Sequence, residues 1–171
     1  MEKGYFQIYT GNGKGKTTAA LGLTLRAICA DKKVFFGQFI KGMDYSELKA
    51  VELLPNLKIQ QFGRDCFIFN QPSEEDIAIA REGLQKIREI LSKGEYDLVV
   101  LDEINVALYY KLFGTQEVIE VINGRAQHVE VICTGRYAPK ELVDLADLVT
   151  EMKEIKHYYT QGVQARVGIE K

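Results

Sequence analysis

The order of the sequence patterns predicts an α/β domain with three layers, in which helices cover both faces of a mainly parallel sheet. Short apolar runs alternate with helical patterns along the whole chain, which is typical of such folds. The run 34–40 is apolar almost throughout, as expected for a parallel strand that is covered on both faces. Polar residues follow several of these runs, and α/β folds place their sites at the carboxyl ends of parallel strands.

The length and composition restrict the class of protein. The chain has 171 residues, which suits one domain over residues 1–171 with a full hydrophobic core. Its net charge of −2 gives no overall basic character, so we expect no nucleic-acid partner. No apolar stretch is long enough to span a membrane, so we expect no membrane partner. The 3 cysteines form no C-x-x-C pair and are odd in number, which fits a reducing, cytoplasmic location.

The first strand, expected at 5–9, leads into a glycine-rich turn and then into a helix at 16–30. The turn and the first helical residues read Thr-Gly-Asn-Gly-Lys-Gly-Lys-Thr-Thr over 10–18. A strand, a glycine-rich turn, Gly-Lys-Thr and a helix together are the arrangement that binds a polyphosphate. The match to G-x-x-x-x-G-K-[ST] is incomplete, because Thr10 stands at the first glycine position and Gly11 follows one residue late.

Each part of this phosphate loop has an expected role. The backbone amides of the turn can approach phosphate oxygens, Lys16 supplies a positive charge, and the Thr17 hydroxyl is placed to bind Mg²⁺. The alternative is an ordinary strand-to-helix turn that is rich in glycine and lysine, but the flanking strand and helix favour phosphate binding. The expected phosphate-binding residues are therefore Gly11, Asn12, Gly13, Lys14, Gly15, Lys16, Thr17 and Thr18.

The second strand, at 34–40, ends in Lys41, and this position would deliver the lysine side chain to the site. A short helix at 46–54 is expected to follow. The run 57–62 predicts a third strand, weaker than the second and nearer an edge of the sheet.

The segment 63–72 is too irregular for a helix and is expected to form a loop. Its two aromatic residues, Phe67 and Phe69, either fill the core beneath the loop or lie beside a planar ligand. Ser73 then begins a capping-box pattern, which predicts the clearest helix of the chain, and Gly94 is placed to end that helix.

Two carboxylates, Asp102 and Glu103, end a strand that is expected at 96–103. This is the Walker B pattern, in which a carboxylate at the end of a strand holds Mg²⁺ directly or through water. A solvated acidic loop is the alternative, but the phosphate loop upstream favours a metal site made of Thr17, Asp102 and Glu103. The sequence leaves open which carboxylate contacts the metal, and whether Glu103 is a general base that activates water.

The remaining elements continue the alternation. We expect helices at 106–112, 116–122 and 140–145, strands at 129–134 and 148–152, and a closing segment at 163–169. Arg136 follows the strand at 129–134, so its guanidinium could pair with phosphate oxygens in a fork. A surface salt bridge is the alternative, and the position of Arg136 alone favours neither interpretation.

Several local strings, taken together, resemble the ATP:corrinoid adenosyltransferases of the CobA/CobO/BtuR family. They are the loop 11–18, the strand ends 38–42 and 101–105, the block 134–139, and the C-terminal residues 156–157 and 168–170. They cover nearly the whole chain in the right order, so this resemblance is far more specific than the phosphate loop alone. A glycine at position 11 instead of position 10 is one of the shared features.

The resemblance implies a P-loop (RecA-like) fold and a reaction. The family transfers the 5′-deoxyadenosyl group of ATP to the Co(I) of a corrinoid, cobalamin or a precursor such as cob(I)yrinic acid a,c-diamide, and releases triphosphate. The loop residues with Lys41 and Arg136 would then bind ATP, with Mg²⁺ or Mn²⁺ as cofactor. The implied catalytic residues are Lys16 and Arg136, which would stabilise the leaving triphosphate, and Glu103, which would hold the metal or a water.

The resemblance also implies a corrinoid site at Phe67 and Phe69, where family members use aromatic side chains to displace the lower ligand of cobalt. Two residues depart from the family pattern, because Cys66 replaces a glycine and Phe69 stands where many members have tryptophan. Because the first expected strand begins at residue 5, we also expect no counterpart of the N-terminal extension of longer members. A one-electron reductant such as a flavoprotein and a homodimer are the further partners implied.

Two other hypotheses use the same loop. The first is an ATPase or small-molecule kinase of the RecA-like group, with Glu103 as its base. The second is a nucleotide-sensing module without turnover, which nothing in the sequence favours.

Overall fold

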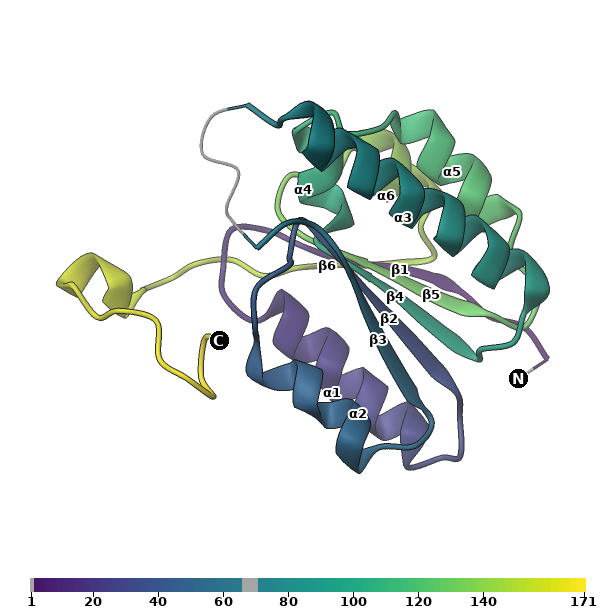
Figure 1. Ribbon diagram of the computed structural model, residues 1–171, viewed down its shortest axis with the longest axis horizontal. Helices are drawn as coiled ribbons and strands as arrows, with labels where there is room; N and C mark the ends of the chain where they lie inside the picture. Colours follow the sequence, from purple (N-terminus) through teal and green to yellow (C-terminus); the bar gives the residue numbers. More distant parts are fainter. Residues whose placement is uncertain (1, 66–70) are drawn as a thin grey trace.

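The computed structural model describes residues 2–65 and 71–171, and its centre is a six-stranded sheet (Figure 1). The strands are β1 Phe6–Thr10, β2 Val34–Phe39, β3 Leu57–Phe62, β4 Leu98–Asp102, β5 Glu130–Thr134 and β6 Leu148–Glu151. They lie in the order β3-β2-β4-β5-β1-β6, and every neighbouring pair is parallel. The prediction of a mainly parallel sheet is therefore confirmed, and β3 lies at an edge as expected.

Helices cover both faces of this sheet, as predicted (Figure 1). One face carries α1 Lys16–Ile28 and α2 Ala50–Leu53, and the other carries α3 Glu74–Lys93, α4 Ile104–Tyr109, α5 Thr115–Asn123 and α6 Lys140–Leu145. Two short 3₁₀ turns complete the described elements, η1 Ser46–Lys49 and η2 Tyr158–Gln161.

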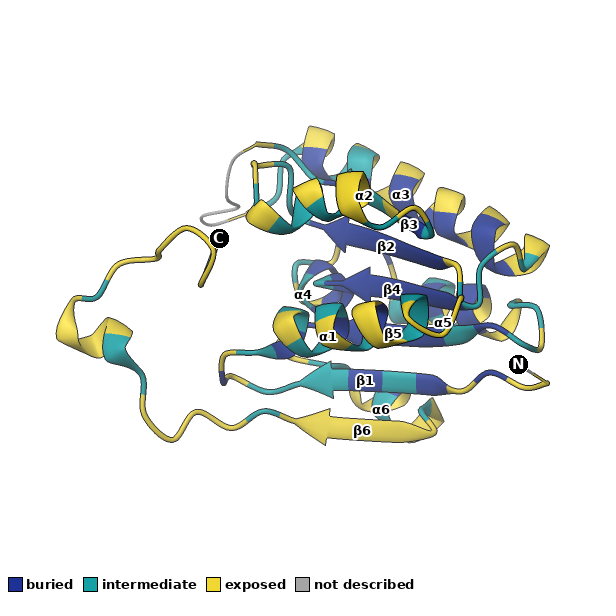
Figure 2. Cartoon of the chain, turned by 90° about the horizontal axis from the view of Figure 1, so that it is seen from below, coloured by how far each residue is buried: buried dark blue, intermediate teal, exposed yellow. Residues whose placement is uncertain are grey.

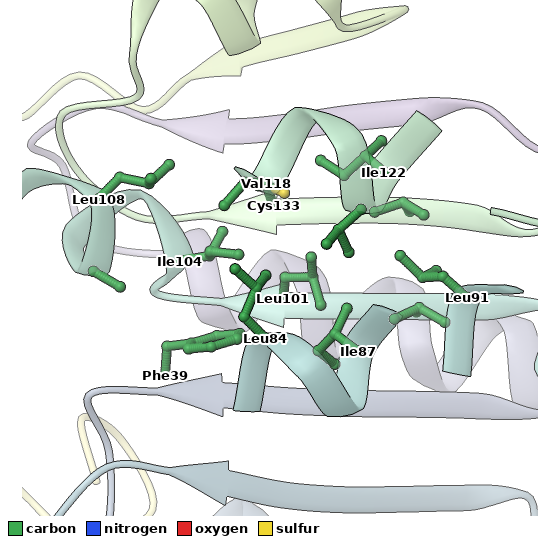
Figure 3. Close-up of a cluster of buried hydrophobic side chains, with 14 of the residues drawn as sticks. Phe39, Leu84, Ile87, Leu91, Leu101, Ile104, Leu108, Val118, Ile122 and Cys133 are labelled. Atoms are coloured by element: carbon green, nitrogen blue, oxygen red, sulfur yellow. The ribbon is translucent and has the colours of Figure 1, made fainter. Parts of the chain in front are cut away.

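Strand β2 shows why the sequence has an unbroken apolar run. Successive side chains of a strand point to opposite faces, so Phe35 and Phe39 join the cluster under α3 to α6, while Phe36 joins the cluster under α1 and α2. All residues of β2 are buried. Figure 3 shows the larger cluster, in which Phe39 lies with Ile87 of α3 and Ile104 of α4. A sheet covered on both faces requires such a strand.

Helix α3 begins and ends where the sequence predicts. The Ser73 hydroxyl accepts from the Asp76 amide at 3.2 Å, and the Asp76 carboxylate accepts from the Ser73 amide at 2.8 Å, which makes a reciprocal capping box. Gly94 ends the helix in the left-handed conformation with φ 65°. One apolar face of the helix is buried against the sheet through Ala80, Leu84, Ile87 and Leu91.

Several boundaries differ from the sequence predictions; for example, the strand expected at 96–103 covers Leu98–Asp102, and α4 ends at Tyr109 instead of residue 112. The first helix ends at Ile28 instead of residue 30, and the helix expected at 46–54 is divided into η1 and α2. Helix α4 begins at Ile104, two residues earlier than expected, because Glu103 adopts a left-handed conformation with φ 60° that turns the chain directly from β4 into the helix.

The segment after β6 leaves the sheet, and its end returns beside the phosphate loop (Figures 1 and 2). Its residues are mostly exposed. Glu170 holds its last turn, because its carboxylate accepts from the Arg166 amide at 2.8 Å and also from the Tyr158 hydroxyl. The Lys14 ammonium lies 3.3 Å from the Ile169 carbonyl oxygen, which ties this turn to the phosphate loop.

The described helices contain a matched pair of glycines for a test of the packing. A Cβ added at Gly83 in α3 would lie 2.5 Å from Cγ of Phe62, whereas one added at Gly22 in α1 would meet no atom within 4 Å. We expect Gly83→Ala to lower the free energy of unfolding by about 1–3 kcal/mol through overpacking. Gly22→Ala should raise it by about 0.5–1 kcal/mol through helix propensity. Urea unfolding measures both, and equal stability of the two variants would contradict the close approach of α3 to β3.

Candidate active site

The carboxyl edge of the sheet brings together the polar residues that the sequence places after separate strands. The phosphate loop follows β1, Lys41 follows β2, Asp102 and Glu103 end β4, and Arg136 follows β5. All four segments lie at one edge of the sheet because the strands are parallel. The structure therefore confirms the expected clustering of these residues, which are up to 125 positions apart in the chain.

The phosphate loop is shaped by glycine at position 11. Gly11 has φ 95°, and a Cβ added there would lie 2.4 Å from the Met152 carbonyl oxygen. The same oxygen accepts a hydrogen bond of 2.7 Å from the Gly13 amide. The loop thus packs against the segment that follows β6, and this close packing leaves no room for a side chain at position 11.

The ammonium of Lys16 lies at the centre of this loop. It donates to the carbonyl oxygens of Gly11 at 2.9 Å and Gly13 at 2.7 Å, and the residue is only 8% exposed. Burial is the main cause that lowers the pKa of Lys16, and the nearby charge of Arg136 adds to it. A poorly hydrated cation of this kind interacts strongly with an anionic oxygen.

Asp102 is fully buried and accepts three hydrogen bonds. The hydroxyls of Thr17 and Thr134 donate to Oδ1 at 2.9 and 2.6 Å, and the Lys41 ammonium donates to Oδ2 at 2.8 Å. Burial alone would lower the pKa of Lys41, but the charge of Asp102 and its hydrogen bond raise it above the ordinary value. Lys41 and Asp102 therefore form a buried ion pair.

Glu103 has a different environment from its neighbour. Its amide donates to the Thr134 hydroxyl at 3.0 Å, and its left-handed backbone turns the side chain toward the phosphate loop, where it lines a hollow. Burial, and then the charge of Asp102, raise the pKa of Glu103, while Lys41, Lys16 and Arg136 act in the opposite direction.

A hollow of about 600 Å³ lies over the phosphate loop. It is lined by loop residues and by side chains from three other parts of the chain: Gly13, Lys14, Gly15, Lys16, Thr17, Thr18, Glu103, Val106, Arg136, His157, Ile169 and Glu170. Lys41 lines a second hollow beside it, together with Thr17, Thr18 and Glu103. Six of the eight expected phosphate-binding residues, 13–18, therefore line one hollow with Arg136, whereas Gly11 and Asn12 line a separate hollow that Arg136 also borders.

Sequence reasoning missed the contribution of the C-terminal segment. His157, Ile169 and Glu170 line the main hollow, and Lys14 forms a salt bridge of 3.5 Å with Glu170. The segment has no buried periodic pattern that would predict its path. The only signal in the sequence was the resemblance of residues 156–157 and 168–170 to a family signature.

The expected corrinoid residues, Phe67 and Phe69, lie outside the described residues. Two described residues that flank this segment are joined by an ion pair. The Arg64 guanidinium donates to the Asp76 carboxylate, with Nε–Oδ1 at 2.8 Å and Nη2–Oδ2 at 3.3 Å. Asp76 also belongs to the capping box of α3. Burial opposes ionisation of Asp76, but the hydrogen bonds from Arg64 and Ser73 lower its pKa overall.

The oxygen donors of the site fit a magnesium ion. Within residues 2–65 and 71–171, no group of three or more His, Cys, Asp or Glu side chains could hold a metal ion. Mg²⁺ usually takes one or two protein oxygens and completes its shell with water and substrate phosphates. The Thr17 hydroxyl and the Glu103 carboxylate beside the hollow, with Asp102 behind Thr17, are a donor set of this type.

The buried ion pair gives a test of the site's geometry. We expect Lys41→Met to lower the free energy of unfolding by about 3 kcal/mol, because it leaves the buried Asp102 charge without its cation. Asp102→Asn in the same chain should recover part of this loss. Lys140→Met, which removes an exposed pair with Asp144, should change stability little. Chemical unfolding measures all three, and a loss in Lys41→Met no larger than in the surface variant would contradict the buried pair.

The fold resembles that of known proteins. The flagellar accessory protein FlaH from Methanocaldococcus jannaschii superposes with a TM-score of 0.61 at 14% identity, covering 88% of this chain and 72% of FlaH. At this identity the likeness concerns the fold alone. No helix in the part of the chain that the structure describes is long and apolar enough to cross a bilayer.

Sequence relatives extend over nearly the whole chain. The corrinoid adenosyltransferase of Escherichia coli K12 is 36% identical over 99% of this chain and 86% of its own length. The Salmonella typhimurium enzyme CobA is also 36% identical with the same coverage, and the Pseudomonas aeruginosa corrinoid adenosyltransferase is 33% identical over 99% of this chain and 84% of its own. The sequence model described as ATP:corrinoid adenosyltransferase BtuR/CobO/CobP matches residues 2–170. The chain therefore belongs to the ATP:corrinoid adenosyltransferase family.

Proposed function

We propose that the residues around the main hollow hold the triphosphate of ATP while its 5′-deoxyadenosyl group is transferred to the Co(I) of a corrinoid. In this transfer the electron pair of Co(I) forms a bond to C5′ of the ribose. The C5′–oxygen bond breaks, and triphosphate leaves with the electron pair of that broken bond. The observation that carries the proposal is the gathering of Lys16, Thr17, Glu103 and Arg136 around one space.

Negative charge grows on the triphosphate as the bond breaks. Donors that are already in place stabilise this charge better than water does. We assign this role to Lys16 and Arg136, together with the backbone amides of residues 11–15 and the side chains of Lys14 and Thr18. Lys41, which follows β2 and pairs with Asp102, would add to the stabilisation of this charge.

The reaction requires no general base, because Co(I) carries no proton that must be removed. We therefore assign Glu103 to holding the metal ion or its water, with Thr17 and with Asp102, which orients the Thr17 hydroxyl at 2.9 Å. Mg²⁺ or Mn²⁺ bound there would neutralise part of the triphosphate charge. The raised pKa of Glu103 would fall when a cation binds beside it.

We propose Phe67 and Phe69 as contacts of the corrinoid, on the resemblance of their segment to the family pattern. Both cobalamin and cob(I)yrinic acid a,c-diamide are proposed substrates, with a one-electron reductant such as a flavoprotein to supply Co(I). A homodimer is supported by the edge strand β6, whose Leu148 and Val149 are 46% and 41% exposed. The free thiols of Cys29 and Cys133 support a reducing, cytoplasmic location.

The fate of the three phosphates tests the proposal directly. The protein would be incubated with ATP, Mg²⁺ and chemically reduced cobalamin and followed by phosphorus NMR. We expect free triphosphate to appear in step with a light-sensitive cobalt–carbon product. Release of ADP and phosphate without that product would contradict the proposal and favour an ATPase.

Lys16→Ala tests the role of the loop. We expect kcat/KM to fall by at least about 100-fold, because one preorganised donor to the developing charge is lost. Lys32→Ala is a suitable control, since this lysine pairs with Asp97 far from the hollow. Turnover of Lys16→Ala at the rate of the control variant would remove Lys16 from the mechanism.

A further inference from the structure

The turn that carries Arg136 into the hollow has an uncommon backbone. Gly135 has φ 127° and Tyr137 has φ 61°, so both neighbours of Arg136 lie at positive φ. A bulky residue rarely adopts this conformation, which is unfavourable without support from surrounding contacts. The turn must therefore be held by the residues packed against it.

Asn105 holds the first half of the turn from helix α4. Its Nδ2 donates to the Gly135 carbonyl oxygen at 3.1 Å, and the Gly135 amide donates to the Tyr9 carbonyl at 3.2 Å. A Cβ added at Gly135 would lie 3.1 Å from Cβ of Asn105 and 3.2 Å from Oε2 of Glu103. The peptide group that precedes Arg136 is thus fixed by hydrogen bonding and by close packing.

Tyr109 and Thr10 hold the second half. The rings of Tyr109 and Tyr137 stack with centroids 4.3 Å apart and planes at 27°, although both side chains are largely exposed. The Ala138 amide donates to the Thr10 hydroxyl at 3.4 Å. Contacts from α4 and from the end of β1 therefore fix both sides of Arg136.

The burial of Asn105 indicates that its hydrogen bond to Gly135 is the reason why a polar residue stands at this position. The residue is fully buried, and its Oδ1 has no hydrogen-bond partner among the described residues. A buried acceptor without a partner is unfavourable, and an apolar side chain of the same shape would pack at this position without that cost. The side-chain amide of Asn105 thus stabilises the turn, although its unpaired oxygen destabilises the core.

We propose that Asn105 and Tyr109 are positioning residues that preorganise Arg136 for a bound triphosphate. The inference rests on the proposed role of Arg136 toward triphosphate. Neither residue contacts the ligand in this scheme. They act by holding the backbone on both sides of Arg136, so that its guanidinium reaches the hollow without first ordering the turn.

A double-mutant cycle tests the coupling, with inorganic triphosphate and Mg²⁺ as the probe in calorimetric titrations. We expect Asn105→Leu, which keeps the side-chain shape, to weaken triphosphate binding about tenfold while the melting temperature stays the same or rises. In an Arg136→Ala background the same substitution should change binding less than about twofold. An equal loss in both backgrounds, or no loss in the first, would overturn the proposal.

The buried Thr24 in α1 provides a matched control. Its Oγ1 also lacks a partner among the described residues, but α1 lies on the other face of the sheet from α4, so Thr24→Val should leave triphosphate binding unchanged. Tyr109→Ala gives an independent test at an exposed position, should Asn105→Leu fail to fold. We expect it to weaken binding only when Arg136 is present, and Tyr109→Phe to restore what the alanine variant loses. Loss of binding in Thr24→Val, or no effect of Tyr109→Ala, would contradict the scheme.

The outcome is separable from that of the proposed function. If the wild-type chain forms no cobalt–carbon bond but the cycle shows coupling, the transfer reaction fails and the positioning role stands. If the chain forms the product and the cycle shows no coupling, only the positioning role fails.

Discussion

The buried charge of Asp102 is the constraint on which the site depends. Burying a carboxylate is costly unless donors surround it, and the donors to Asp102 come from three other places in the chain. Thr17 follows β1, Lys41 follows β2 and Thr134 ends β5. One side chain therefore fixes the ends of four strands relative to one another, and with them the phosphate loop.

Two adjacent carboxylates consequently have separate tasks. The oxygens of Asp102 accept hydrogen bonds from Thr17, Thr134 and Lys41 inside the protein. Glu103 points into the hollow, and burial and the Asp102 charge raise its pKa. A cation bound beside Glu103 would stabilise the ionised form of this carboxylate. Such a cation suits a reaction whose leaving group carries several negative charges and which needs no base.

Local rules account for what the sequence predicted. The capping box at Ser73, the apolar run of β2 and the glycine-rich turn are patterns of neighbouring residues, so each could be identified from the chain alone. The reason for glycine at position 11, its close contact with Met152, could not be identified in this way. The pair Lys41–Asp102 could be placed only at a common edge, because residues 61 positions apart meet through the whole sheet. The early start of α4 depends on the backbone angle of Glu103, and the return of Glu170 to Lys14 depends on a distant contact, so no local sequence pattern predicted either of them.

The backbone where the strands leave the sheet explains why the site can be rigid. Ile40, Glu103 and Tyr137 follow β2, β4 and β5, and all three have φ near 60°. Such conformations cost about 1–3 kcal/mol each and persist only where the surroundings determine them. The backbone of Gly63 packs closely against Ile40, because a Cβ added at Gly63 would lie 2.5 Å from the Ile40 carbonyl carbon. In the proposed function, turns held in this way would keep Lys41 and Arg136 aligned before charge develops on the leaving triphosphate.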